Sequence, residues 1–338
     1  MKYLLYLTLG AALAWPQSIT NTYSTDINGR RVEAPSIAAT GASANGERTE
    51  RTQSINGRQV PLEQIVDRVV REDANGKVTE RILKKFDPTG RLALTERVMI
   101  EENKLPGGGS SVRETTYRTD VNGAIHEDQR RTTETRVQGS TTTANIVVDR
   151  PTLNGSFETV EKRSEVTDGP ATNQRTTASV YRRDGAGGFQ ETLRIVKTSA
   201  KQNDTTTETT ANYEPGVTGQ LQLASQTESV STKQPNGTET TQVNMFAHTV
   251  AGQLQDNNAK MRVLEQQIIE RHTNSDGSVA ETLSVRRPSM GDPNRLGELQ
   301  KISETVCKGK CEPEKPAAEP AAGFSGSHFP LQTVSEIF

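Results

Sequence analysis

Residues 181–189 read Tyr-Arg-Arg-Asp-Gly-Ala-Gly-Gly-Phe, and the same arrangement of aromatic residue, glycine turn and second large apolar residue recurs along the chain. Six turn glycines are each followed two positions later by a large apolar residue, with spacings of 33, 32, 32, 32 and 33: Leu92, Ile125, Phe157, Phe189, Leu221 and Leu254. An aromatic residue precedes most of these turns. A fixed period of this length indicates a repeat protein.

A second set of turn signals lies about midway between the first. It includes Asn75-Gly76, Asp168-Gly169 and Asn236-Gly237. Asn-Gly and Asp-Gly favour hairpin turns because both central residues tolerate positive φ. The sequence therefore predicts one β-hairpin per repeat of about 32 residues, with strands of roughly 10 to 12 residues.

The strands are polar on both faces, as residues 205–210 (Thr-Thr-Thr-Glu-Thr-Thr) show. Such strands fit a sheet that is wetted on both sides and held by cross-strand Thr and Glu–Arg pairs. We predict an all-β fold: an elongated antiparallel β-meander of hairpin repeats in a single layer. A β-solenoid or a closed or two-layer β fold are the alternatives. Seven Phe, six Tyr and one Trp are few for the girdles of an outer-membrane barrel, which the polarity also disfavours.

Two segments carry a competing helical pattern. Apolar residues recur at helical spacing in Leu62, Ile65, Val66, Val69 and Val70, and again in Met261, Leu264 and Ile268. Both segments run into turn signals that belong to the hairpin series. We therefore predict strands there, with a capping helix at either end as the alternative.

The first 14 residues predict export. Lys2 precedes an apolar run of about 11 residues, and Ala12-Leu13-Ala14 fits signal-peptide cleavage between Ala14 and Trp15. The run is too short for a transmembrane helix, which needs about 20 residues. We expect a protein that is secreted, periplasmic or on the cell surface, without a transmembrane anchor.

The remaining organisation follows from composition. Residues 15–50 form a polar segment that holds the first strand or strands, and residues 51–306 form the repeat region. Cys307 and Cys311 flank a three-residue turn, and an exported chain favours a disulfide between them. Residues 312–323 form a Pro/Ala-rich linker. Residues 324–338 form an apolar tail, either a disordered end or a docking peptide.

No motif for catalysis, a cofactor or a metal stands out. The four histidines have no ligand-like neighbours, and no Gly-x-Ser-x-Gly elbow or phosphate loop occurs. Forty basic and 42 acidic residues are interleaved, which gives no nucleic-acid footprint.

We therefore predict a non-enzymatic structural or interaction protein of the cell envelope or surface, with an unknown protein or surface as partner. Exposed strand edges predict self-association by strand pairing. The alternative is a carbohydrate- or surface-binding module that uses a row of aromatic residues on one face: Tyr117, Tyr181, Tyr213 and Phe246. An enzyme with an unfamiliar site is the third hypothesis, and no motif supports it.

Overall fold

The computed structural model describes residues 17–25, 31–43, 46–55, 58–87, 89–247, 261–289 and 292–308. Every secondary-structure element in these ranges is a β-strand. The first ten are β1 (Gln17–Thr25), β2 (Arg31–Ser43), β3 (Gly46–Ile55), β4 (Arg58–Glu72), β5 (Gly76–Phe86), β6 (Leu92–Leu105), β7 (Gly109–Thr119), β8 (Ile125–Gln138), β9 (Thr141–Pro151) and β10 (Phe157–Asp168). The others are β11 (Asn173–Arg183), β12 (Phe189–Gln202), β13 (Thr205–Pro215), β14 (Leu221–Lys233), β15 (Glu239–Ala247), β16 (Arg262–Thr273), β17 (Val279–Arg286), β18 (Pro288–Ser289), β19 (Asp292–Leu296) and β20 (Gln300–Lys308).

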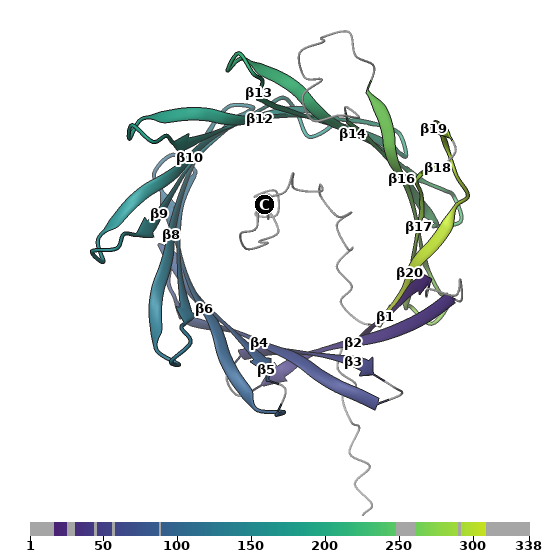
Figure 1. Cartoon of the computed structure of the whole chain (residues 1–338), viewed down its shortest axis with the longest axis horizontal. Helices are drawn as coiled ribbons and strands as arrows, with labels where there is room; N and C mark the ends of the chain where they lie inside the picture. The colour runs from purple at the N-terminus through teal and green to yellow at the C-terminus, as the bar shows by residue number, and fades with distance from the viewer. Residues whose placement is uncertain are drawn as a thin grey trace, which may run out of the picture.

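Eighteen strands form one closed antiparallel barrel (Figure 1). Each of β1 to β16 pairs with the next strand, and β20 pairs with both β17 and β1. The short hairpin β18–β19 is inserted between β17 and β20 and lies outside the ring. The predicted all-β antiparallel meander is confirmed, and so is its closed alternative.

The prediction of an open, elongated sheet is wrong. Closure pairs strands almost 300 residues apart, whereas the hairpin signals in the sequence describe only neighbours. Every wall strand in the described part of the chain has a partner on each side. The free edges predicted to pair chain to chain are therefore absent from this wall.

The two segments with helical spacing are strands. Residues 58–72 form β4 and residues 262–273 form β16, each hydrogen-bonded between two neighbours. The first segment is also rich in β-branched residues, which favour strands, among them Val60, Val66 and Val69. Ladder pairing on both sides therefore overrides the local helical spacing.

Nine hairpins join an odd-numbered strand to the strand that follows it in the wall, and eight of them carry a β-bulge in the second strand. The residue skipped by the register is Leu62, Thr95, Asp128, Val160, Thr192, Ala224, Leu264 or Ile302. Odd-numbered strands from β5 to β13 have 11 residues, whereas β6, β8 and β12 have 14. Bulges bend a strand and increase its twist, so a bulge repeated around the sheet assists closure.

The nine hairpins turn at the same end of the barrel, here called the tip rim. Five of its turns span residues 87–91, 120–124, 152–156, 184–188 and 216–220 and share one hydrogen-bond pattern. In the first, Asp87 N–H donates to Arg91 O and Gly90 N–H donates to Asp87 O, both at 2.9 Å. Gly90 has φ of 79°, so the repeated glycine supplies a left-handed residue.

The two faces of the wall differ in burial. Of the thirteen buried residues other than glycine, ten share one face by strand register: Thr116, Thr133, Ala144, Ile146, Ala178, Val180, Asn212, Val243, Gln267 and Val285. Side chains converge on the concave side of a closed wall and diverge on its convex side. We therefore assign this face to the lumen and call it the inner face. The other is the outer face.

Candidate interaction surface

All eight aromatic residues in the part of the chain that the structure describes lie on the outer face, near the tip rim. The strand register connects them through directly opposed residues: Tyr181 opposes Lys162 and Glu191, and Tyr213 opposes Arg194 and Leu223. This aromatic band consists of Tyr23, Phe86, Tyr117, Phe157, Tyr181, Phe189, Tyr213 and Phe246.

The bulges position the band. Tyr117, Tyr181, Tyr213 and Phe246 each stand immediately beside the register shift of their hairpin, on the odd-numbered strand. These four residues are the predicted aromatic row, and the structure places them on one face. Phe157 and Phe189 lie between them at the starts of β10 and β12. In the sequence these two residues only follow turn glycines, so the predicted row does not include them.

Cations stack on several of the rings. Arg130 lies 3.9 Å from the ring centroid of Phe157, and Lys162 lies 4.3 Å from that of Phe189. Arg97 and Lys301 lie over Tyr117 and Tyr23 at 5.7 and 5.6 Å. Cation–π contacts of this kind fix the orientation of both partners. The band is therefore an alternation of aromatic and basic groups.

The bulges also create ion pairs that a regular strand cannot make. Residues three apart normally face opposite sides of a sheet. Across the bulge of β12, Arg194 Nη2 donates to Glu191 Oε2 at 2.7 Å, and Arg130 makes the equivalent pair with Glu127 in β8. Hydrogen bonding from Arg194 lowers the pKa of Glu191, despite partial desolvation, and Glu191 in turn raises the pKa of Arg194.

Apolar side chains are exposed mainly at the tip rim. Val121, Leu153 and Val217 occupy the second position of three turns and are 101%, 108% and 76% exposed. In the turn at 120–124 the Asp120 carboxylate accepts hydrogen bonds from two backbone N–H groups. The first residue of the turn therefore holds it in shape, and the Val121 side chain takes no part. Six further exposed apolar residues lie at this end: Val60, Leu62, Leu92, Ile125, Leu264 and Leu299.

Turns at the opposite rim are polar by comparison. They read Asp73-Ala-Asn, Gly169-Pro-Ala-Thr172, Gln234-Pro-Asn-Gly237 and Asn274-Ser-Asp-Gly277. In the last, hydrogen bonds from Ser278 lower the pKa of Asp276. The barrel is therefore asymmetric along its axis, with an apolar tip rim above an aromatic band and a polar rim at the other end.

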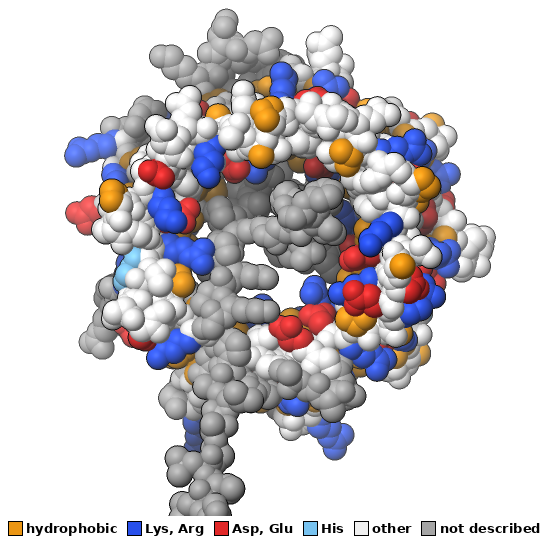
Figure 2. All heavy atoms as spheres, turned by 180° about the vertical axis from the view of Figure 1, so that it is seen from behind, with side chains coloured by type: hydrophobic (Ala, Val, Ile, Leu, Met, Phe, Trp, Pro, Cys, Tyr) orange, Lys and Arg blue, Asp and Glu red, His pale blue; other side chains and the backbone are white. Residues whose placement is uncertain are grey.

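Charged side chains occupy the middle of both faces. On the outer face Glu80 is 2% exposed and pairs with Arg68 and Arg97, the latter at 2.5 Å. On the inner face Arg81 pairs with Asp67 at 2.7 Å, and Arg163 pairs with Glu165 at 2.7 Å. Figure 2, which views the molecule from behind, shows basic and acidic groups interspersed around the ring. Among the described residues of the wall, neither face carries a continuous apolar belt.

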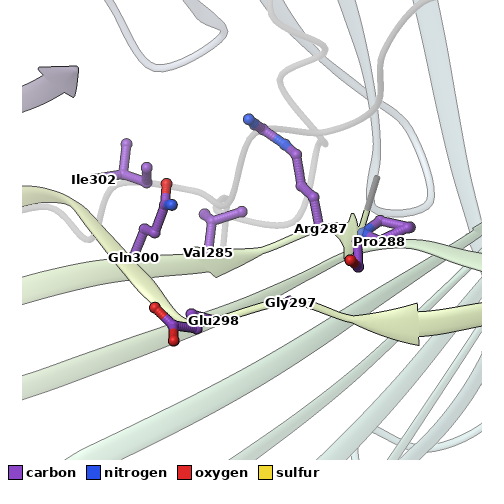
Figure 3. Close-up of a pocket in the computed structure, with 8 residues that line it drawn as sticks. Val285, Arg287, Pro288, Gly297, Glu298, Gln300 and Ile302 are labelled. Carbon is purple, nitrogen blue, oxygen red and sulfur yellow. The ribbon is translucent and has the colours of Figure 1, made fainter. Parts of the chain in front are cut away.

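A small cavity of about 210 Å³ lies at the base of the β18–β19 hairpin (Figure 3). Val285, Gln300 and Ile302 line it from β17 and β20, Pro288 lines it from β18, and Arg287 and Glu298 line it from the connecting segments. Val285, Gln300, Ile302 and Arg287 point to the same side of the sheet (Figure 3). Only Arg287 and Glu298 bring charge, and Arg287 pairs with Glu265 at 2.7 Å.

The described part of the chain holds no group of three His, Cys, Asp or Glu residues arranged to bind a metal ion. It also contains no helix of the length and apolarity that crossing a membrane requires. Of the predicted cysteine pair, Cys307 lies in β20 and Cys311 lies outside the described residues, so the disulfide stays a prediction. Ala14, Trp15 and the tail residues 312–338 likewise lie outside them.

Comparisons with known proteins reveal the fold and no closer relationship. No family model matches the chain, and no curated protein matches its sequence. Among solved structures, three mutants of the Rh. blastica porin superpose with TM-scores of 0.52, 0.52 and 0.52 at 7%, 8% and 8% identity. Each match covers 87% of this chain and 99% of the porin. The chain therefore has a porin-like barrel fold.

Proposed function

We propose that this chain is an exported, non-catalytic barrel of the cell envelope that works as an interaction protein through the outer surface of its tip rim. The observation that carries the proposal is the aromatic band, because it gathers every described aromatic side chain on one face at one end. Aromatic residues are enriched where proteins bind partners, since they combine large contact area with a polar edge.

The porin-like fold supports an envelope location, and the wall chemistry supports a peripheral one. A spanning barrel presents an apolar band about 25 Å tall to lipid, and an outward Arg or Lys at mid-membrane costs about 2–4 kcal/mol. The outer face instead carries the Arg68–Glu80 pair midway between the two rims, below the aromatic band. A barrel with this wall is stable in water and sits on an envelope layer without crossing it.

Fractionation of cells that export the chain tests this proposal. We expect the protein in the envelope fraction and its release by alkaline carbonate or urea without detergent. Release only by detergent would identify a spanning porin, and recovery entirely as free soluble protein would exclude an envelope partner. Both outcomes contradict the proposal.

Carbohydrate binding is the second candidate, because the four predicted row residues do share a face. The stacked cations cover one side of Phe157 and Phe189, whereas no cation stacks on Tyr181 or Tyr213 among the described contacts. A double substitution Tyr181→Ala/Tyr213→Ala should then abolish pull-down on insoluble polysaccharide. Thr177→Ala/Thr209→Ala, on the same face away from the rim, is the matched control. Unchanged pull-down by the tyrosine variant would exclude this candidate.

A further inference from the structure

We propose that the partner of the tip rim is a lipid surface: the apolar turn residues enter the membrane interface and the aromatic band lies at headgroup level. This inference rests on the proposed function, and it names the partner that the tip rim binds. It begins from the distribution of exposed apolar side chains. Nine of the thirteen large apolar residues exposed on the described part of the chain lie at the tip rim.

The turn tips have the form of insertion residues. Val121, Leu153 and Val217 stand at equivalent positions of three turns, and all are at least 76% exposed. Nothing in the folded barrel explains an apolar residue there, since turn geometry depends on the first residue and the glycine of each turn. Isolated exposed apolar residues are ordinary, but equivalent ones repeated along one arc of a single rim can contact a plane together.

The depth of the band matches a membrane interface. Tyr117, Tyr181 and Tyr213 each lie three residues before the first residue of their turn, which is about 10 Å along a strand. Interfacial segments bury their apolar face about 5–10 Å into the headgroup and acyl boundary. With the tips at that depth, the aromatic rings come to the headgroup level, where Tyr and its polar hydroxyl are favoured.

The stacked cations suit the same position. The guanidinium of Arg130 and the ammonium of Lys162 lie over the rings of Phe157 and Phe189, which keeps both charges at the level of the band. Arg130 and Arg194 of the band are paired with Glu127 and Glu191, so binding should depend on apolar insertion more than on lipid charge. Below the band the outer face is charged, which limits the depth of insertion.

Flotation with lipid vesicles tests the inference. The full chain, purified after export, is mixed with phosphatidylcholine vesicles and with phosphatidylcholine–phosphatidylglycerol vesicles that contain a trapped dye. We expect flotation with both, little loss at high salt, and retention of the dye. No flotation would overturn the lipid assignment, and dye release would overturn surface docking in favour of a spanning state.

Matched variants locate the contact. Val121→Ser/Leu153→Ser/Val217→Ser should reduce vesicle partitioning by about tenfold or more, because each side chain gives up apolar burial. Val69→Ser/Val70→Ser/Val230→Ser changes other exposed apolar residues, 52%, 53% and 40% exposed, that lie away from the turn tips, and this variant should bind as the unmodified chain does. Equal loss in both variants would overturn the assignment, with circular dichroism confirming that both are folded.

The outcomes separate this inference from the proposed function. Envelope association in cells without vesicle binding would leave an interaction role and overturn the lipid partner. Binding to insoluble polysaccharide, unaffected by the turn-tip variant, would assign the band to carbohydrate. Absence from the envelope fraction would contradict the proposed function itself.

Discussion

The hydroxyl oxygens of Thr20 in β1 and Thr305 in β20 lie 3.0 Å apart, although 285 residues separate them in sequence. The two residues are directly opposed in the antiparallel pair that closes the barrel. Tyr23 strengthens the same seam by donating from its hydroxyl to Glu304 at 3.3 Å. The closed wall therefore depends on pairing between the first and last strands.

Cross-linking tests this closure. Thr20→Cys/Thr305→Cys, in a chain with Cys307→Ser and Cys311→Ser, should form a disulfide without a catalyst, since directly opposed antiparallel residues have Cα atoms about 4.5–5.5 Å apart. A shift in mobility on non-reducing gels detects it. Thr20→Cys/Thr167→Cys joins β1 to the distant β10 and should remain reduced. Cross-linking of the control but not of the seam would contradict the ring.

The buried carboxylate of Glu80 should depend on both of its arginines. Arg68→Ala/Arg97→Ala leaves a charge that is 2% exposed without its two partners, and removal of such partners typically costs about 3–5 kcal/mol. Arg81→Ala, which breaks the more exposed pair with Asp67, should cost less than about 1 kcal/mol. Urea unfolding monitored by circular dichroism gives both values. Equal effects would show that burial of Glu80 is unimportant.

Two glycines of a single turn should differ in their tolerance of alanine. Gly187 has φ of 86°, whereas Gly185 has no positive φ and an added Cβ there meets open space. Gly187→Ala should lower the free energy of unfolding by about 1–2 kcal/mol, and Gly185→Ala should leave it unchanged or raise it slightly. Thermal unfolding of the two variants measures both costs. Equal costs would show that the positive φ of Gly187 does not restrict which residue the position accepts.

Acid should destabilise the barrel. The pKa of Glu191 is lowered by Arg194, that of Glu50 by Arg48, and that of Asp87 by hydrogen bonds from Thr89 and Arg91. A carboxylate whose pKa is lowered by folding contributes its full stabilisation above its usual value, 4.5 for Glu, and loses it as pH falls through the folded value.

Urea midpoints measured between neutral pH and pH 3 should therefore decline below about pH 4.5. Glu191→Gln should start from a lower midpoint at neutral pH and decline less steeply, because one of the linked protons is gone. A parallel decline in the variant and the unmodified chain would show that the Glu191–Arg194 pair is not linked to folding.

The local parts of the fold are readable in the sequence because they depend on adjacent residues. The glycines at 90, 123, 155, 187 and 219 mark the tip-rim turns, and the midway Asn-Gly and Asp-Gly pairs mark several of the turns at the opposite rim. The aromatic row was predicted from the same period. That the members of the row share a face depends on which residues oppose each other across strands, such as Lys162 and Tyr181, and this is known from the register.

Closure was not predictable from these signals. An open sheet and a closed ring use the same hairpins, and they differ only in whether β1 meets β20. The polarity of the strands predicts that the wall does not face lipid. It carries no information on whether the first and last strands pair, and that pairing decides closure. The even-numbered strands are longer than the odd-numbered ones, so successive turns are unequally spaced along the sequence. This unequal spacing is the sequence signal for the bulges.

Deletion of Thr192 tests whether the bulge residue is an insertion into an otherwise regular ladder. Glu191 is then bonded directly to Leu193, so alternation keeps Glu191 opposite Tyr181 and leaves Phe189 and Glu191 on the outer face. The contact of Phe189 with Lys162 and the pair of Glu191 with Arg194 should both be retained, with a cost of about 1 kcal/mol for the lost local twist.

Deletion of Thr198 in the same strand, which has no bulge at that point, is the matched control. It shifts the register of the β12 residues that follow it, towards the opposite rim, moves them to the other face of the sheet and should cost about 1–3 kcal/mol. Acrylamide quenching of a tryptophan substituted for Phe189 reports which face it occupies. Unchanged quencher access and the smaller loss of stability are expected for the Thr192 deletion. Loss of quencher access there would mean that the bulge determines the face.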